Sequence, residues 1–234
     1  MFVSKRVLAV LLLVASRAMA QAQPDDVQPQ AEGIESPNYV WNAKKGEQYL
    51  ALSAKGSALR GAVTFEVCQG CHRVGALGRP DGSYPRLAGQ HASVLIKQMT
   101  DIRAGRRENP KMYPFVSQHV IGPTDIADIA VYLQNLPVPP DNGKGAGGDL
   151  DKARSLYARD CQACHGANGA GDAPKFFPRV SGQHYKYLLR EARYIRDGKR
   201  RNANPDMVEV IRPYSDADLD AVADYMSRFP LAGN

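Results

Sequence analysis

Residues 68–72 read CQGCH and residues 161–165 read CQACH, and these two pentapeptides contain all four cysteines of the 234-residue chain. Each pentapeptide has two cysteines three positions apart and a histidine directly after the second. On a helical turn the two thiols lie on one face, where they can bond the vinyl groups of a porphyrin, and the adjacent imidazole can reach its iron. The pattern predicts two covalently bound haem c groups.

The predicted site residues follow from these two copies. The haem-attachment residues are Cys68, Cys71, Cys161 and Cys164, and the proximal iron ligands are His72 and His165. Two other uses of cysteine remain open, namely a zinc site of four thiolates and one disulfide within each pair. The pairs are 93 residues apart, which is wide for a zinc ribbon, and neither alternative needs a histidine after both pairs. Haem attachment is therefore the favoured interpretation.

The first twenty residues have the pattern of a secretory signal peptide. Lys5 and Arg6 precede an apolar run over residues 7–15, and the sequence AMA at 18–20 supplies small residues at a cleavage site. The apolar run is too short to cross a bilayer as a helix. We expect cleavage near Gln21 and export to the periplasm, and an uncleaved membrane anchor is the alternative.

The basic charge of the chain is modest once this signal is set aside. The full sequence carries a formal net charge of +6, and residues 1–20 contain three basic residues and no acidic one, which leaves +3. The propionates of two haems would offset most of that charge. The composition therefore gives no support for nucleic-acid binding, whereas local basic patches can still orient a protein partner.

The sequence repeats itself with a shift of 93 residues. PRLAGQH at residues 85–91 aligns with PRVSGQH at 178–184, and GRR at 105–107 aligns with GKR at 198–200. The chain is therefore interpreted as a tandem duplication with a Pro/Gly-rich linker. The predicted organisation is a signal peptide at 1–20, a partly disordered N-terminal extension at 21–56, a first domain at 57–137, a linker at 138–149 and a second domain at 150–234.

Each half is predicted to be helical. Ile126, Ile129 and Leu133 recur at helical spacing near the end of the first half, and no sustained alternation indicates strands. Ser215, three residues before Asp218, predicts a capping box at the start of the last helix. The fold class is therefore all-α. A domain of about 90 residues has little core of its own, so it gains stability by enclosing a large apolar macrocycle.

Methionines supply the candidates for the second axial ligand of each iron. Met112 and Met207 each follow an Asn-Pro pair by two residues, in NPKM and NPDM, on a loop ahead of the last helix of their half. We expect them to bind the iron opposite the motif histidines, because thioether ligation fills the coordination sphere. Methionine packing on the haem edge is the alternative. Met99 and Met226 are expected in the core.

Two further histidines, His91 and His184, occupy equivalent positions directly after Gly-Gln. Repeated histidines in a haem protein allow a bis-histidine interpretation. We favour a simpler role at the start of a helix, where the side chain caps the helix or faces solvent.

These features together resemble the dihaem cytochromes of the cytochrome c4 type. The likeness rests on the two Cys-x-x-Cys-His motifs, the PRLAGQ and PRVSGQ segments, the GRR and GKR turns and the two late methionines, and it covers roughly residues 57–234. It implies two tandem class I cytochrome c domains, each wrapped around one covalent haem with His/Met ligation and related by a pseudo-twofold axis. It also implies that the carbonyls of Pro85 and Pro178 accept a hydrogen bond from the proximal histidines.

The resemblance implies a carrier that passes single electrons between redox proteins, without substrate chemistry at iron. The expected donor is a quinol–cytochrome c oxidoreductase or a dehydrogenase, the expected acceptor is a terminal oxidase or reductase, and any membrane association would be through these partners. A dihaem enzyme, such as a peroxidase or a thiosulfate dehydrogenase-like protein, is the alternative. Thiosulfate dehydrogenases use a cysteine sulfur at the active haem, whereas all four cysteines here are assigned to haem attachment.

A basic segment in the second half offers a candidate surface for such partners. Its side chains, within twelve residues, are Arg190, Arg193, Arg196, Lys199, Arg200 and Arg201. A solvated face is the simpler interpretation. A docking patch for an acidic redox protein is the sharper one, because complementary charge raises the association rate.

Overall fold

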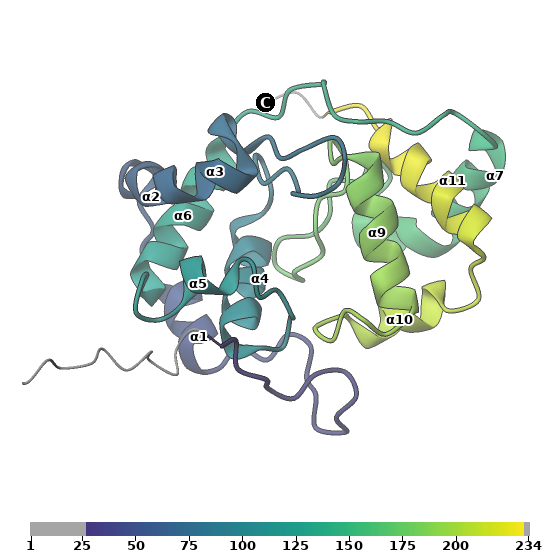
Figure 1. The fold of residues 1–234 in the computed structure, drawn as a ribbon. Coiled ribbons are helices and arrows are strands. Elements are labelled where there is room, and N and C mark those ends of the chain that lie inside the picture. The colour runs from purple at the N-terminus through teal and green to yellow at the C-terminus, as the bar shows by residue number, and fades with distance from the viewer. Residues whose placement is uncertain (1–26, 232–234) are drawn as a thin grey trace, which may run out of the picture.

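The computed structural model describes residues 27–231, which form two helical lobes side by side (Figure 1). Within these residues the only β-type pairing is an isolated bridge between Asp172 and Phe177. None of the helices in the same range is long and apolar enough to cross a membrane. The predicted all-α fold is confirmed. The predicted signal peptide lies outside the described residues.

Short helices make up both lobes. In the first lobe they are α1 (Gly46–Ser53), α2 (Ala58–Thr64), η2 (Phe65–Cys68), α3 (Gln69–His72), η3 (Val74–Ala76), α4 (Ala92–Ala104), α5 (Tyr113–Val116) and α6 (Pro123–Asn135). In the second lobe they are α7 (Leu150–Leu156), η4 (Tyr157–Cys161), α8 (Gln162–His165), α9 (Tyr185–Arg196), α10 (Pro205–Ile211) and α11 (Asp216–Ser227). The predicted capping box is present, since the Ser215 hydroxyl accepts a hydrogen bond from the amide of Asp218 at the start of α11.

Each lobe buries its own hydrophobic core. In the first lobe α6 packs against α1, α2 and α4, and in the second α11 packs against α7 and α9. Ile126, Ile129 and Leu133 are at most 3% exposed, so the predicted apolar stripe of α6 faces the core. Met99 and Met226 are also buried, as expected.

The lobes differ by one residue in the helix that leads to each haem motif. The ring of Phe65 packs on Tyr132 and the ring of Tyr157 packs on Tyr225, with ring centroids 5.7 Å apart in both pairs. Tyr132 and Tyr225 are 93 positions apart, as are the cysteines, whereas Phe65 and Tyr157 are 92 apart. The first lobe enters its motif through a tight 3₁₀ turn and the second through a wider π turn, which accommodates the extra residue.

Before each haem motif, equivalent residues are therefore 92 positions apart. Gly61 and Ala153 are such a pair, and each lies against the last helix of its lobe. A Cβ atom on Gly61 would lie 2.0 Å from the backbone oxygen of Asp128, so α2 and α6 approach more closely than any larger residue allows. Ala153 is fully buried and already carries that Cβ. The helix pair of the first lobe is therefore the more closely packed of the two.

The N-terminal extension is integrated into the fold. Helix α1 packs against α4 and α6 of the first lobe. Residues 27–45 precede it and make hydrogen bonds to both lobes. In Figure 1 this purple segment follows the lower edge of the molecule. The predicted disordered lead covers residues 21–29. Residues 21–26 of it lie outside the described residues, and Gln28 makes hydrogen bonds to the first lobe.

Candidate haem sites and the interface between the lobes

The two haem motifs lie on short helical turns at equivalent places in the lobes. In the first lobe Cys68 closes η2, and Cys71 and His72 lie on α3. After each motif histidine the backbone enters a left-handed conformation, with φ of 67° at Arg73 and 79° at Gly166. Glycine adopts this conformation freely, whereas a side-chain-bearing residue is strained there. The first lobe thus holds strain that the second lobe avoids.

Each motif histidine is buried beside a proline carbonyl. His72 and His165 are 8% and 7% exposed. The Nδ1 atom of His72 lies 3.3 Å from the carbonyl oxygen of Pro85, and that of His165 lies 3.0 Å from the carbonyl oxygen of Pro178. When Nδ1–H donates to the carbonyl, Nε2 is the nitrogen left to bind iron. Burial lowers the pKa of both imidazoles, which favours the neutral form that binds a metal.

The two cysteine pairs lie in separate lobes. Burial raises the pKa of Cys68 to about 11 and that of Cys161 to about 12, so both thiols stay uncharged. None of the four cysteines forms a disulfide. Residues 27–231 also contain no cluster of three or more His, Cys, Asp or Glu side chains that could hold a metal ion. The zinc and disulfide alternatives therefore have no support, whereas paired thiols beside a buried histidine fit a covalent haem.

Met112 and Met207 are half-buried and pack against the core of their own lobes. Met112 directly precedes α5, and its amide donates to the backbone and side-chain oxygens of Asn109, at 3.1 and 3.2 Å. Met207 lies in α10, which the side chain of Asn204 caps and Pro205 begins. The predicted loop is thus wrong for Met207, because Asn followed by Pro is a favourable helix start. The role of both methionines as iron ligands stays a prediction.

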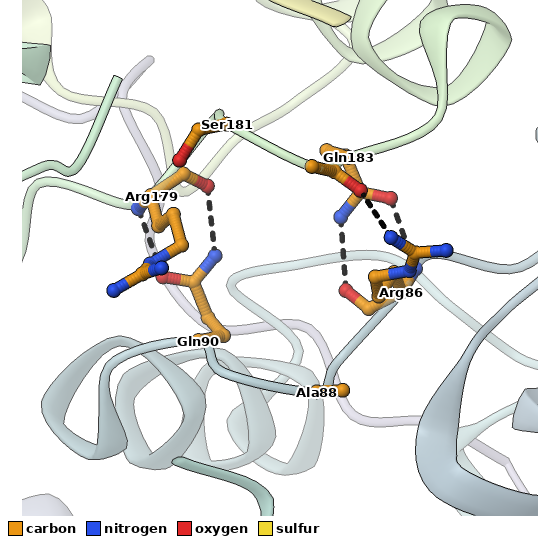
Figure 2. A pocket seen from close by; sticks show the side chains of 7 residues that line it. Arg86, Ala88, Gln90, Arg179, Ser181 and Gln183 are labelled. Carbon is orange, nitrogen blue, oxygen red and sulfur yellow. Dashed lines mark hydrogen bonds between the residues drawn. The ribbon is translucent and has the colours of Figure 1, made fainter. Parts of the chain in front are cut away.

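Two equivalent glutamines join the lobes reciprocally. Gln183 accepts a hydrogen bond from the amide of Arg86 and donates one to its carbonyl, both at 2.9 Å. Gln90 makes the same two bonds to Arg179, at 2.9 and 3.0 Å. Figure 2 shows the two pairs facing each other across a small cavity. The interface therefore has the pseudo-twofold symmetry that the resemblance implies.

His91 and His184 extend this symmetry. The Nε2 atom of His91 lies 2.7 Å from the carbonyl oxygen of Ala170, and that of His184 lies 2.8 Å from the carbonyl oxygen of Leu77. Both acceptors belong to the opposite lobe and are equivalent in the repeat. Both histidines directly precede a helix, as expected, but neither imidazole caps it. His184 is 1% exposed, so solvent contact is wrong for His184, whereas His91 is half-buried. The repeated histidine after Gly-Gln is the sequence feature that could have indicated this contact between the lobes.

Two equivalent arginines offer buried hydrogen-bond donors at the interface. The Nε atoms of Arg86 and Arg179 are buried and have no protein partner. The cavity that both arginines line measures about 10 Å³, which leaves room for roughly one water molecule. A space of this size holds a water molecule and not a carboxylate group, so a bound water is the partner that suits these donors. The fit to the predicted cofactor therefore rests on the paired thiols beside the buried histidines and not on these arginines.

The repeated fold occurs in known proteins. A family model for cytochrome c matches the chain twice, over residues 58–137 and 150–229. The chain belongs to the cytochrome c family. Each matched segment contains one complete Cys-x-x-Cys-His motif, so this cytochrome binds two covalent haem c groups.

Relatives with tandem domains refine this assignment. The cytochrome is 30% identical to a cytochrome c4 of Azotobacter vinelandii, over 74% of this chain and 89% of that protein. It is 32% identical to a thiosulfate dehydrogenase electron acceptor of Stutzerimonas stutzeri, over 68% of this chain and 77% of that protein. The resemblance to cytochrome c4 is thereby confirmed.

Solved structures show the same likeness. Reduced recombinant cytochrome c4 from Pseudomonas stutzeri superposes with a TM-score of 0.67 at 27% identity, over 75% of this chain and all of that one. A thiosulfate dehydrogenase from Marichromatium purpuratum superposes with a TM-score of 0.65 at 29% identity, over 75% of this chain and 41% of that one. Both likenesses cover the two-lobed part of the cytochrome.

The arginine-rich segment of the cytochrome, residues 190–201, makes ion pairs with acidic side chains of the same chain. Its acidic partners are Glu191 for Arg190, Arg200 and the first-lobe Arg107; Asp216 for Arg193 and Arg196; and Glu35 for Arg201. Burial alone would raise the pKa of Glu191, but the adjacent guanidinium groups hold it below its usual value. Most charges of this segment are therefore paired with protein carboxylates, and docking of an acidic redox protein on it stays a prediction.

Proposed function

We propose that this cytochrome carries single electrons, with His72 and Met112 as the iron ligands of the first haem and His165 and Met207 as those of the second. One observation carries the proposal. Each lobe offers a buried histidine oriented by a proline carbonyl, and a methionine packed against the core of the same lobe. Two protein ligands fill the axial positions of an iron, which leaves no position for a substrate.

The residues of the chain fix the surroundings in which each haem works. Haem iron supplies the chemistry by cycling between its ferrous and ferric states. The carbonyls of Pro85 and Pro178 hold the imidazole rings in one orientation. Gln90 and Gln183 keep the two lobes in one relative position, because each replaces the solvent contacts of a backbone amide and carbonyl in the other lobe.

The names of the relatives support a choice of partners. One relative is a thiosulfate dehydrogenase electron acceptor and others are cytochromes c4. The proposed donor is a dehydrogenase or a quinol–cytochrome c oxidoreductase, and the proposed acceptor is a terminal oxidase or reductase. The proposed compartment is the periplasm, which rests on the signal-like pattern of residues 1–20.

A dihaem enzyme is the second candidate, and the likeness to part of a thiosulfate dehydrogenase favours it. All four cysteines, however, belong to the two attachment motifs, so no cysteine remains to act at an iron. A methionine near each core also argues against an open iron. The carrier is therefore the better-supported function.

Spectroscopy of the mature protein distinguishes these candidates. Intact mass after acid–acetone extraction should exceed that of the peptide by about 1.2 kDa, for two covalent haems. The ferrous protein should keep its spectrum under carbon monoxide, because both axial positions are filled. A carbon monoxide complex at one haem would instead support the enzyme.

The ligand assignment has its own test. The oxidised protein should show the weak near-infrared band of sulfur-to-iron ligation, and Met207→His and Met112→His should each remove about half of it while both haems stay attached. An unchanged band in either variant would exclude that methionine as a ligand.

A further inference from the structure

Residues 27–45, called the strap from here on, connect the loop that precedes Met112 in the first lobe with the Phe176–Pro178 turn beside His165 in the second. The cytochrome c family model begins only at residue 58, so the match to that family leaves the strap without a role. In Figure 1 the strap runs below α4 and reaches the loop that precedes α10. Its contacts therefore reach one turn near a proposed iron ligand in each lobe.

The first of these contacts holds the loop that carries Met112. The side-chain amide of Gln28 donates to the carbonyls of Ile102 and Arg107, at 2.7 and 2.8 Å, and its oxygen accepts from the amide of Asn109 at 2.8 Å. Asn109 in turn accepts two hydrogen bonds from the amide of Met112. Gln28 therefore holds Asn109, and Asn109 holds the turn at Met112.

The middle of the strap is fitted closely to both lobes. A Cβ atom on Gly105, which ends α4, would lie 1.6 Å from the carbonyl oxygen of Pro29. A Cβ atom on Gly33 would lie 2.8 Å from the Cβ atom of Arg201 in the second lobe. The amide of Ile34 also donates to the carbonyl of Arg201 at 2.8 Å. The strap backbone thus lies directly against one turn in each lobe.

The contact of the strap with the turn behind His165 is aromatic. The indole of Trp41 stacks on Phe177 at 5.9 Å with an interplanar angle of 22°, and it meets the edge of Phe176 at 6.4 Å. Phe177 directly precedes Pro178, whose carbonyl accepts from His165. Phe176 has φ of 59°, a strained conformation that persists only where its surroundings hold it. Trp41 supplies part of that support.

A first-lobe cation lies against the same indole. The ammonium of Lys97 lies 5.5 Å from the ring centroid of Trp41, a distance that suits a cation–π contact. Lys97 is buried on α4 and pairs with Asp101 at 2.5 Å. Trp41 is therefore bound by a first-lobe cation and by second-lobe aromatic rings, which links its position to both lobes.

We propose that the strap positions the axial ligands of both haems: Gln28 holds the Asn109–Met112 turn of the first site, and Trp41 holds the Phe177–Pro178 turn behind His165 of the second. This inference rests on the ligands assigned in the proposed function. Gln28 and Trp41 are positioning residues, since they act through Asn109 and Phe177.

Imidazole competition tests the first half of the proposal. In Gln28→Ala the loss of three hydrogen bonds loosens the Met112 turn, so the oxidised protein should bind imidazole at one haem about tenfold more tightly than the wild type. The other haem should be unchanged. Gln30→Ala is the matched control, because Gln30 is an exposed strap residue. Equal imidazole affinity in Gln28→Ala, Gln30→Ala and the wild type would overturn this half.

Redox titration tests the second half. In Trp41→Ala water gains access to the Phe177–Pro178 turn, so the midpoint potential of one haem should fall while the other stays constant. The affected haem should be the one whose potential Met207→His also changes. Trp41→Phe retains an aromatic ring and should restore most of the wild-type potential. Two unchanged potentials in Trp41→Ala would show that the strap only packs there.

The two arms also separate this inference from the proposed function. A wild type without the near-infrared band would reject methionine ligation, and with it the Gln28 half of the proposal. The redox arm would still decide the Trp41 half, because a shift of one potential in Trp41→Ala does not require a methionine ligand. A lower melting temperature without either spectroscopic change would reject both halves, since packing alone explains that result.

Discussion

The two lobes have similar cores, but they differ on the solvent-facing side of the helix that leads into each haem motif. In the first lobe Leu59, Val63 and Val67 follow one another at helical spacing and are 85%, 67% and 61% exposed. With the one-residue offset, their second-lobe equivalents are the polar residues Asp151, Ser155 and Arg159. The aromatic contact behind this helix is the same in both lobes.

This difference shows which positions the cofactor restricts. Side chains that enclose a haem must fill a fixed shape, so the inner positions of the two halves stay alike. The outer positions meet only solvent or a partner and can diverge. An exposed apolar stripe on one lobe alone therefore points to a property of the first lobe that the second does not share.

The largest expected difference in stability between the lobes concerns the contact between α2 and α6 and its second-lobe equivalent. Gly61→Ala places a Cβ atom 2.0 Å from a backbone oxygen of α6 and should destabilise the holoprotein by about 3 kcal/mol. Ala153→Gly at the equivalent position should cost only about 1 kcal/mol, because the helix loses propensity but meets no clash. Guanidinium unfolding followed by circular dichroism measures both. Similar losses in the two variants would reject the difference in helix approach.

A smaller contrast is expected within the reciprocal interface. Gln183→Ala leaves a buried amide and carbonyl of Arg86 without partners and should cost about 2 kcal/mol. Gln90→Ala removes the same two bonds to Arg179, but Gln90 is only half-buried, so water can replace it and the cost should be about 1 kcal/mol. The same unfolding measurement shows which of the two variants loses more stability. A larger loss for Gln90→Ala would contradict the burial argument.

The haem sites were predictable because their signals are local. The cysteines and histidine of each motif lie within one turn of helix, and the repeat shows that both halves share a fold. The one-residue offset was not predictable, because it depends on the choice between a 3₁₀ and a π turn. Alignment at a constant shift pairs Leu59 with Lys152 and hides the true equivalence.

Contacts between distant segments account for most of the errors. His184 does stand at the start of α9, but its imidazole contacts the carbonyl of Leu77, which lies 107 positions away in the sequence. The ion pairs of the basic segment with Glu35 and of Arg107 with Glu191 were not predictable, because Glu35 and Arg107 lie outside that segment. The strap had no repeat partner, so the duplication carried no information about it.

Backbone strain provides a third and still smaller contrast. Arg73 holds the conformation that Gly166 holds in the second lobe, with φ of 67° and ψ of 163°. Arg73→Gly should stabilise the protein by about 1 kcal/mol, because the relief of strain outweighs the larger entropy that glycine loses on folding. Gly166→Ala should destabilise it by a similar or larger amount. Thermal unfolding of the holoproteins checks both signs, and a destabilised Arg73→Gly would show that the arginine is not strained.

The smallest expected effect on stability accompanies the outer stripe itself. Leu59→Asp with Val63→Ser installs the second-lobe residues on the first lobe, and both side chains are largely exposed. The free energy of unfolding should change by less than about 0.5 kcal/mol, because little burial is lost. Binding of a hydrophobic fluorescent dye to the holoprotein should fall, since the stripe is an exposed apolar surface. The reverse variant, Asp151→Leu with Ser155→Val, should raise dye binding by moving the stripe to the second lobe. Equal dye binding in both variants and the wild type would show that the stripe does not act as a distinct surface of the first lobe.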